Sequence, residues 1–145
     1  MKKIILLSLL AALVSFAKAN PDHDYVVTVD QLPEASRTFV NTHFSNVAIA
    51  YCMRDAHSFE VRLADASEVE FYINGSWKEV DCKYKALPQS ILALLPTTIP
   101  AYIKANFPTA IITKVSLKHW GYDLELNNGL DVEFNSAGQF IRIDD

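Results

Sequence analysis

The feature that most constrains the fold of this chain is an internal repeat. Residues 69–77 read VEFYINGSW, and residues 132–140 read VEFNSAGQF. Displacing the sequence by 63 positions aligns residues 31–82 with residues 94–145 without a gap. Ten positions are then identical: Leu32/Leu95, Pro33/Pro96, Phe44/Phe107, Ile49/Ile112, Leu63/Leu126, Val69/Val132, Glu70/Glu133, Phe71/Phe134, Gly75/Gly138 and Asp81/Asp144. Chance does not keep proline, glycine and aromatic residues in register, so the sequence predicts a tandem duplication of one supersecondary unit.

Each copy opens with a helical pattern. The segment LPE at 32–34 puts proline at the start of a helix, where its missing N–H would have no partner in any case. Apolar residues recur at helical spacing in 39–44 and again in 95–107. Pro100 interrupts the second pattern and predicts a helix that bends or begins late. The segment 87–92 predicts a further short helix before it.

Four short segments in each copy have the pattern of strands. Phe59, Val61 and Leu63 alternate with Glu60 and Arg62, which predicts an antiparallel strand with one covered face. The turns between segments, LADAS, ING, NNGL and SAG, have hairpin length. The predicted strands are 47–53, 58–63, 68–73 and 77–82 in the first copy, and 110–115, 122–126, 131–135 and 140–143 in the second.

The predicted fold class is therefore α+β. It is a tandem duplication of a helix plus a four-stranded antiparallel meander, forming one curved sheet with the helices on one face. The opposite face of the sheet is predicted to be polar, acidic and open to solvent.

The first 19 residues, MKKIILLSLLAALVSFAKA, have the pattern of a secretory signal peptide. Two lysines precede an apolar run from Ile4 to Phe16, and Ala17-Lys18-Ala19 matches an A-x-A cleavage site. The apolar run is shorter than the roughly 20 residues that span a bilayer. We therefore expect export, cleavage after Ala19 and no membrane insertion of the mature chain.

The mature chain, residues 20–145, is predicted to be a single domain made of two repeats, about 26–82 and 87–145. Of the 13 basic residues, three lie in the signal peptide, so ten basic residues face 17 acidic ones and the net charge is −7. A negative charge of this size disfavours binding to nucleic acid or to anionic lipid surfaces.

Several of these segments resemble one known family. The Leu-Pro pairs, the two V-E-F strands, the segment GSWKEVDC at 75–82, YIKANFP at 102–108 and the final GQFIRIDD look like the PepSY-like, or beta-lactamase-inhibitor-like, exported proteins of Bacteroides and relatives. The resemblance covers about residues 26–145. It implies a periplasmic location and the duplicated helix-plus-sheet fold. It implies no activity, because the family is one of unknown function and fold does not carry function.

The two cysteines leave two states open. Export permits a disulfide between Cys52 and Cys82. In the predicted meander these residues lie three strand spacings, roughly 14 Å, apart, whereas the Cα atoms of a disulfide lie within roughly 7 Å. Buried free thiols are therefore the preferred interpretation.

No metal, cofactor or catalytic centre is expected. His43 is predicted to be a surface or boundary residue of the first helix, and no H-E-x-x-H or metal-type Cys/His spacing is present. Oxygen-bearing side chains around 65–70 and 127–133 could attract a hard cation, but a solvated acidic face explains them better. Nucleophile and phosphate-binding motifs are absent, and the repeated Glu70 and Glu133 are predicted to be solvent-exposed, so we do not expect an enzyme.

Trp77 admits two predictions. A two-residue turn at Asn74-Gly75 would direct it toward solvent. The second copy, with Ser136-Ala137-Gly138, favours a three-residue turn. If the copies share that turn, Phe71 lies opposite Trp77 and Phe134 opposite Phe140, and both aromatic pairs belong to the core face. This second register is the one we expect.

The candidate binding residues are consequently on the other face of the sheet. Tyr51 and Tyr72 are predicted there, and His119 and Trp120 form a hairpin tip equivalent to the tip at His57. Aromatic residues with polar neighbours are frequent contact residues for a protein or peptide. The sequence predicts an exported, non-enzymatic binding or interaction module whose partner is a periplasmic protein or peptide. The alternatives are an inhibitor or regulator of an envelope peptidase, and a calcium-responsive periplasmic accessory protein.

Overall fold

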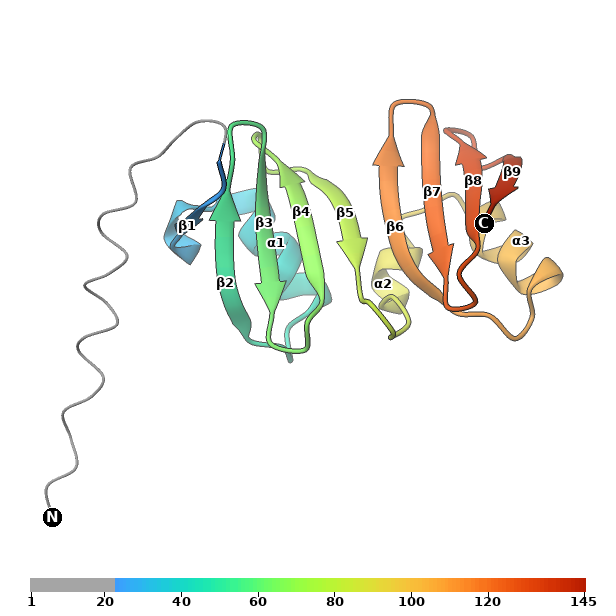
Figure 1. Ribbon diagram of the computed structural model, residues 1–145, viewed down its shortest axis with the longest axis horizontal. Coiled ribbons are helices and arrows are strands. Elements are labelled where there is room, and N and C mark those ends of the chain that lie inside the picture. Colours follow the sequence, from blue (N-terminus) through green and yellow to red (C-terminus); the bar gives the residue numbers. More distant parts are fainter. Residues whose placement is uncertain (1–22) are drawn as a thin grey trace, which may run out of the picture.

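The computed structural model describes residues 23–145, so the predicted signal peptide lies outside the described residues. The described chain forms one open antiparallel sheet of nine strands with three α-helices, which confirms the predicted α+β class (Figure 1). The strands are β1 Tyr25–Val27, β2 Ile49–Arg54, β3 Ser58–Leu63, β4 Glu68–Tyr72, β5 Trp77–Asp81, β6 Ile112–Lys118, β7 Gly121–Leu126, β8 Asp131–Asn135 and β9 Phe140–Asp144. The helices are the 3-10 turn η2 Val29–Gln31 and the α-helices α1 Glu34–His43, α2 Gln89–Leu92 and α3 Thr98–Asn106.

The strands lie in the sheet in the order in which they follow along the chain, from β1 to β9. The sequence predicted eight strands, and that number was wrong by one. The additional strand, β1, pairs Tyr25–Val27 antiparallel with Cys52–Arg54 of β2. Three residues are too few to show an alternating pattern, so the sequence alone gave no signal for this edge strand.

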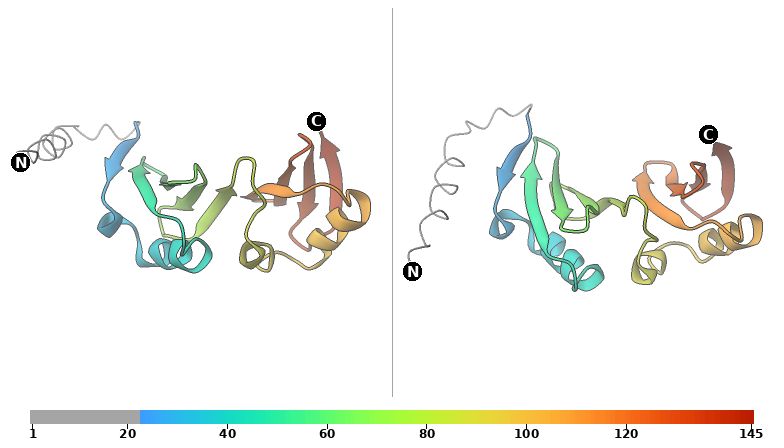
Figure 2. Two further views of the ribbon diagram at one scale, coloured as in Figure 1. Left: turned by 90° about the horizontal axis from the view of Figure 1, so that it is seen from below. Right: turned by 60° about the horizontal axis from the view of Figure 1, so that its bottom comes forward.

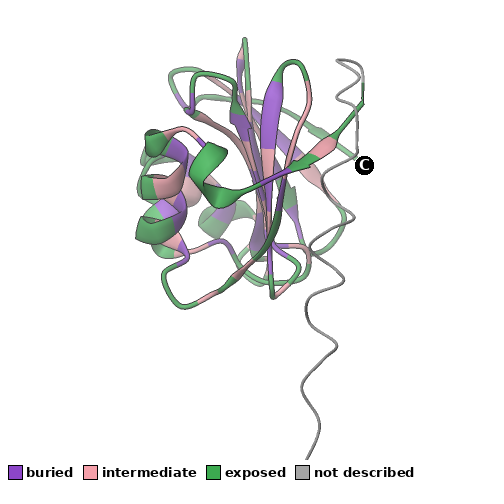
Figure 3. Ribbon diagram, turned by 90° about the vertical axis from the view of Figure 1, so that its left-hand side faces the viewer, coloured by how far each residue is buried: buried purple, intermediate pink, exposed green. Residues whose placement is uncertain are grey.

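The three α-helices lie on the same side of the sheet (Figures 2 and 3). They pack on the apolar side chains that alternate along the strands, such as Phe59, Val61 and Leu63 in β3. Val40 of α1 and Ile99 and Ile103 of α3 belong to the same buried cluster. The strand side chains between these apolar positions point to the side without helices, here called the open face.

The same aromatic arrangement occurs in both halves. In the first half, Phe39 of α1 stacks on Trp77 at a ring-centroid distance of 5.8 Å and meets Phe71 edge-on at 5.6 Å. In the second half, Tyr102 of α3 stacks on Phe140 at 4.7 Å and meets Phe134 edge-on at 5.5 Å. Stacked and edge-to-face rings are the two favoured aromatic geometries, so each helix is oriented by the same contact with its strands.

The register of the aromatic pairs confirms the expected turn. Phe71 lies opposite Trp77, and Phe134 lies opposite Phe140, each next to a β-bulge. Trp77 is partly buried against the core, as predicted. The expectation was only half right for Phe140, which contacts Tyr102 but remains 41% exposed. No further strand among residues 23–145 lies beyond β9, so the outer side of Phe140 is uncovered.

Helix starts and hairpin turns meet in both halves, which explains why the Leu-Pro pairs and the glycines recur. Gly75 and Gly138 have positive φ angles of 94° and 80°. A Cβ atom on Gly75 would approach Pro33 Cβ to 2.7 Å, and one on Gly138 would approach Pro96 Cβ to 2.5 Å. The carbonyls of the two glycines also accept hydrogen bonds from helix side chains, from Ser36 Oγ at 2.9 Å and from Thr98 Oγ1 at 2.7 Å.

The two halves join where β5 pairs with β6. The register includes only Glu79–Asp81 and Lys114–Ser116, with Val80 opposite Val115 at its centre. On the helix side, His43 at the end of α1 shares a 2.7 Å hydrogen bond with Ser90 of α2. We call this junction the seam.

Cys52 and Cys82 are both free and buried, on β2 and directly after β5. The strands β3 and β4 lie between β2 and β5 in the sheet. Within residues 23–145, no helix has the length and apolar character that crossing a bilayer requires.

The contact between glycine turns and helix starts predicts a graded response to alanine. Gly75→Ala and Gly138→Ala should each destabilise the domain by more than the about 1–2 kcal/mol that a left-handed conformation costs an L-residue, because each new methyl group also meets a proline. Gly129→Ala is the matched control, since Gly129 has φ +85° but nothing lies within 4 Å of its added Cβ. Urea unfolding of the three variants measures the difference. Equal losses in all three would show that the proline contacts do not constrain these turns.

Candidate functional site

The open face carries most of the charged side chains of the sheet. Alternation places two charged residues, two positions apart, on each of β3, β4, β7 and β8, on the side opposite to the buried apolar residues. Cross-strand register then brings these side chains into rows, such as Glu60, Glu70 and Glu79 across β3, β4 and β5. A row of like charges is destabilising unless cations lie between its members.

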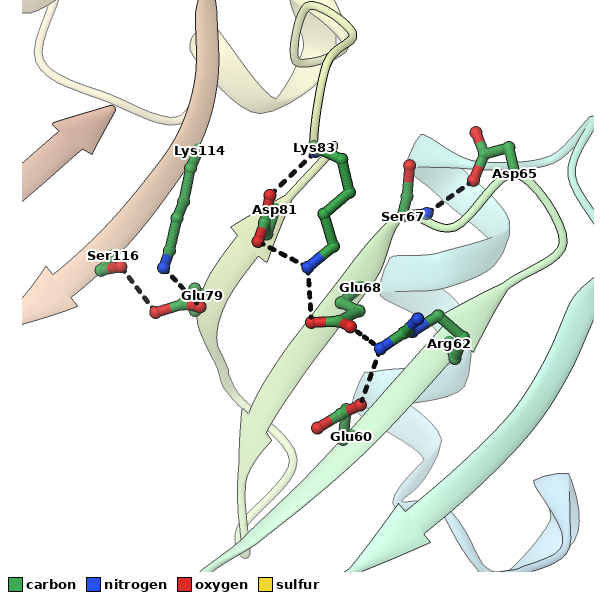
Figure 4. Close-up of polar contacts among 10 residues, drawn as sticks. All are labelled: Glu60, Arg62, Asp65, Ser67, Glu68, Glu79, Asp81, Lys83, Lys114 and Ser116. Atoms are coloured by element: carbon green, nitrogen blue, oxygen red, sulfur yellow. Dashed lines mark hydrogen bonds and ion pairs between the residues drawn. The ribbon is translucent and has the colours of Figure 1, made fainter. Parts of the chain in front are cut away.

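In the first half, two basic side chains connect three carboxylates of the open face into a chain of ion pairs that we call the ladder (Figure 4). Its members are Glu60, Arg62, Glu68, Lys83 and Asp81. Arg62 pairs with Glu68 and also lies 3.9 Å from Glu60. Lys83 Nζ lies 3.2 Å from Glu68 and 2.9 Å from Asp81. The ladder therefore crosses from β3 to the end of β5 with alternating charge.

A second group of polar contacts crosses the seam. Lys114 Nζ of β6 lies 3.3 Å from Glu79 of β5, and Ser116 Oγ donates a 2.7 Å hydrogen bond to the same carboxylate (Figure 4). Burial lowers the pKa of the Lys114 ammonium, but the neighbouring Glu79 carboxylate outweighs this effect and the pKa lies above its ordinary value. The charged Lys114 therefore forms an ion pair with Glu79 that links the two halves on the open face.

The second half of the open face is different, because fewer of its carboxylates form ion pairs. Glu133 pairs with Arg142 at 2.5 Å and is only 8% exposed, so the prediction that it is solvent-exposed was wrong. Its carboxylate is covered by the guanidinium of the neighbouring strand. Asp123, Glu125 and Asp131 take part in none of the ion pairs found in residues 23–145.

The electrostatic consequence is visible at Asp123. Burial raises the pKa of its carboxyl group, and the nearby Asp131 and Glu133 raise it further, while Lys118 and Lys114 partly oppose the rise. Asp123 lies directly opposite Glu133, and Glu125 lies directly opposite Asp131. In this part of the open face, the strand pair β7–β8, four carboxylates therefore lie close together, and the lysines of β6 compensate their charge only in part.

The four candidate binding residues occupy three separate places. Tyr51 lies on β2 opposite Arg62, whose guanidinium stands 5.8 Å from the tyrosine ring. Tyr72 lies at the end of β4, with Lys78 Nζ 5.9 Å from its ring. His119 and Trp120 form the two-residue turn between β6 and β7. The structure places both tyrosines on the open face, but it does not bring all four residues into one pocket.

A cavity of about 230 Å³ lies beside the seam. It is bounded by the segment after α1, by the β3–β4 turn and by the linker from β5 to α2, and Cys82 and Ser67 are among its lining residues. Burial raises the pKa of the Cys82 thiol, and the Ser67 hydroxyl partly opposes that rise. A thiol with a raised pKa stays protonated at neutral pH, so this cavity does not contain an activated nucleophile.

The described residues contain no group of three His, Cys, Asp or Glu side chains arranged to hold a metal ion. The turns that could have attracted a cation use their oxygens internally. Asp65 accepts a hydrogen bond from the Ser67 amide at 2.9 Å, and Asn127 accepts one from the Ile111 amide at 3.0 Å.

Sequence reasoning missed the ladder and the difference in ion pairing between the halves. It identified the acidic residues but not their partners, because Lys83 and Lys114 lie 15 and 35 positions from Glu68 and Glu79 along the chain. The available signal was the departure between copies: Lys78 and Glu79 in the first copy correspond to Ile141 and Arg142 in the second.

The chain is similar to one known protein family and to several solved structures. The profile of the family described as "Putative beta-lactamase-inhibitor-like, PepSY-like" matches residues 19–65 and 57–142. Among curated proteins no match is found.

Three similar crystal structures come from Bacteroides, each with a TM-score of 0.78. A "putative periplasmic protein of unknown function" from Bacteroides vulgatus is 37% identical, over 85% of this chain and 100% of its own. A "putative periplasmic protein from DUF2874 family", also from B. vulgatus, is 32% identical over 87% and 100%. A "putative calcium-regulated periplasmic protein" from Bacteroides thetaiotaomicron is 30% identical over 84% and 97%.

The raised pKa of Asp123 predicts how stability depends on pH. The unfolded chain ionises this group near the ordinary aspartate pKa of about 3.9, whereas the folded chain ionises it only at higher pH. Folding is therefore penalised as pH rises through this interval, and the penalty persists at neutral pH. Asp123→Asn should raise Tm at about pH 7 and leave it unchanged at about pH 3.

Thermal unfolding at both pH values measures this effect, with Glu125→Gln as the control on the same strand. Glu125 is exposed, so its replacement should change Tm less than that of Asp123. A lower Tm for Asp123→Asn at neutral pH would contradict the proposed charge surplus.

Proposed function

The chain belongs to the PepSY-like, beta-lactamase-inhibitor-like family, and on that basis we propose that it is an exported, non-enzymatic binding module of the periplasm. The periplasmic location is supported by the similar Bacteroides proteins and by the signal-peptide pattern of the first 19 residues. The binding surface is the open face, and the ligand is a basic segment of a protein or peptide.

The observation that carries this proposal is the contrast between the two halves of the open face. In the first half, the ladder pairs carboxylates with cations, and these charges have little left to offer a partner. On β7–β8, Asp123, Glu125 and Asp131 form none of the ion pairs found within residues 23–145, and the nearby Lys114 and Lys118 offset their charge only in part. Carboxylates already held close together on rigid strands attract a cationic segment and orient it without much reorganisation.

The tip of the β6–β7 hairpin gives this surface an aromatic component. Trp120 is half-buried and His119 is exposed, at the end of the strands that carry Ser116 and Asp123. A half-buried tryptophan can contact a ligand without losing much side-chain freedom, which is why tryptophan is frequent at binding hot spots. Tyr51 and Tyr72 would contact the part of a longer partner that extends over the first half.

Trp120 offers a direct readout of binding. The chain contains two tryptophans, and Trp77→Phe leaves Trp120 as the single fluorophore while introducing the residue found at the equivalent position, Phe140. A lysine-rich peptide should shift the emission of Trp120 in a saturable and salt-sensitive manner, whereas a glutamate-rich peptide of equal length should not.

Matched variants separate the open face from net charge. Asp123→Asn with Asp131→Asn should weaken binding of the lysine-rich peptide by about tenfold, since each of these half-buried carboxylates contributes up to about 1 kcal/mol. Asp30→Asn with Glu34→Gln removes the same charge from η2 and α1, so affinity should change little. Equal losses in the two double variants, or equal binding of the two peptides, would refute the proposed surface.

The runner-up function is an inhibitor or regulator of an envelope peptidase. An inhibitor would block such an enzyme at equimolar concentration and would survive the encounter uncleaved. Simple binding by the open face would leave the peptidase active on small substrates.

A calcium response is suggested only by the description of the B. thetaiotaomicron relative. Because the described residues hold no group of three potential ligands, we expect calcium at about 1–10 mM to leave Tm no higher than the same concentration of magnesium does. A calcium-specific rise in Tm that a chelator reverses would contradict this expectation and would assign a cation role to the open face.

We also infer that the two halves descend from one duplicated unit. Support comes from the two aromatic contacts, in which Phe39, Phe71 and Trp77 correspond to Tyr102, Phe134 and Phe140. The contacts between Pro33 and Gly75 and between Pro96 and Gly138 follow the same correspondence.

A further inference from the structure

The strand β9 forms one edge of the sheet, and its residues are exposed along its whole length. It nevertheless contains three large apolar side chains, Phe140, Ile141 and Ile143. An exposed apolar edge strand pairs readily with another strand, and proteins usually protect such edges with charge, proline or a covering segment. No such cover lies over β9 within residues 23–145.

Elsewhere in the sheet, an edge equivalent to that of β9 pairs with another strand. By the 63-residue correspondence, β5 is the counterpart of β9, and its outer edge is covered by β6. Val80 of β5 is 0% exposed because Val115 lies opposite it, whereas its counterpart Ile143 is 42% exposed. The outer edge of β9 thus corresponds to the outer edge of β5, but no strand takes the place that β6 has beside β5.

The backbone of β9 is oriented for such pairing. At the seam, the Cys82 amide donates a 2.9 Å hydrogen bond to the Thr113 carbonyl. Cys82 lies two residues after Val80, and Thr113 lies two residues before Val115, which is opposite Val80 in the register. Backbone groups of alternate residues in an antiparallel strand point to the same side, so those of Val80 point toward β6. The equivalent residue in β9 is Ile143, whose N–H and C=O therefore point to the open edge.

The charges of β9 specify a partner. Arg142 and Asp144 flank Ile143, and both lie on the open face because they are opposite Glu133 and Asp131 of β8. If a second β9 runs antiparallel with Ile143 opposite Ile143, each Arg142 faces Asp144 of the other copy. If the two-fold axis lay at Arg142 instead of Ile143, each Arg142 would lie opposite the Arg142 of the other copy. Like charges directly opposite each other are unfavourable.

Asp144 has a specific need for a cation. It lies directly opposite Asp131, and it forms no ion pair with the residues the structure describes. Arg142 of a second copy would supply the missing positive charge, while Arg142 of the same chain stays on Glu133. The self-complementary sequence around Ile143 therefore fits a second copy of this chain better than an arbitrary strand.

We infer that two copies pair through their β9 edges, antiparallel and about a two-fold axis at Ile143, so that their sheets join into one continuous sheet. This inference is independent of the proposed ligand, because it uses the edge of the sheet and not the surface of β7–β8. If both hold, the two acidic surfaces lie side by side and bind a long basic partner bivalently.

The dimer should be weak, because one five-residue strand buries far less area than a standard interface, and even standard interfaces are sometimes only micromolar. Sedimentation equilibrium of the mature chain from about 10 µM to about 1 mM should show a reversible monomer–dimer transition. Species larger than dimers that grow with concentration would indicate head-to-tail pairing of β9 with β1, and a monomer throughout would show that the edge stays free. Either result would overturn the inference.

Charge exchange tests the register. Arg142→Asp alone and Asp144→Arg alone each put like charges across the two-fold axis, so each variant should be monomeric at concentrations at which the native chain is dimeric. An equimolar mixture of the two should dimerise again, because every pair is then opposite in charge. The double variant, with both substitutions in one chain, should also dimerise on its own.

Edge identity is tested with a matched pair of lysine substitutions. Ile143→Lys should abolish dimerisation, whereas Val26→Lys, at the exposed edge strand β1, should not. Circular dichroism and thermal unfolding of each variant check that it is folded before its mass is interpreted. Failure of the mixed charge variants to associate while both are folded would refute the proposed register, and dimers that persist in folded Ile143→Lys would refute the edge.

Discussion

The fold depends on one packing contact that each half makes independently. A helix begins at a proline lying against a glycine turn, and an aromatic residue one to two turns into that helix stacks on the bulged strand beyond the turn. Because the glycine carbonyl also accepts a side-chain hydrogen bond from the helix, its start and its orientation are both fixed against the hairpin. Within residues 23–145, α1, α2 and α3 lie on one side of the sheet, and charged residues of the strands occupy the other side.

The seam converts two such halves into one sheet. Val80 and Val115 are fully buried at its centre, and Glu79 with Lys114 and Ser116 closes it on the open face. The residues corresponding to this edge at the end of the chain are Arg142, Ile143 and Asp144. They retain the apolar centre but replace the acidic flanks by one residue of each sign.

Much of the architecture could be predicted from the sequence, because short-range patterns determine it. The helix start at Pro33, the position of Pro100 in the first turn of α3 and the opposition of Phe71 and Trp77 all follow from local residue chemistry and the repeat. Long-range pairing could not be predicted. The short strand β1 forms only because it pairs with β2. Glu133 is buried because the side chain of Arg142, on the neighbouring strand, covers its carboxylate. The four candidate binding residues were assigned to one surface, but strand order separates them.

If the edge of β9 behaves as the edge of β5 does, a second chain takes the place of β6. Hydrogen exchange of the backbone amides of Val80 and Ile143, followed as protein concentration rises, distinguishes a paired β9 from a free one. We expect Val80 to be protected at all concentrations and Ile143 to become protected as dimers form. Rapid exchange at Ile143 that does not change with concentration, beside a protected Val80, would contradict this expectation.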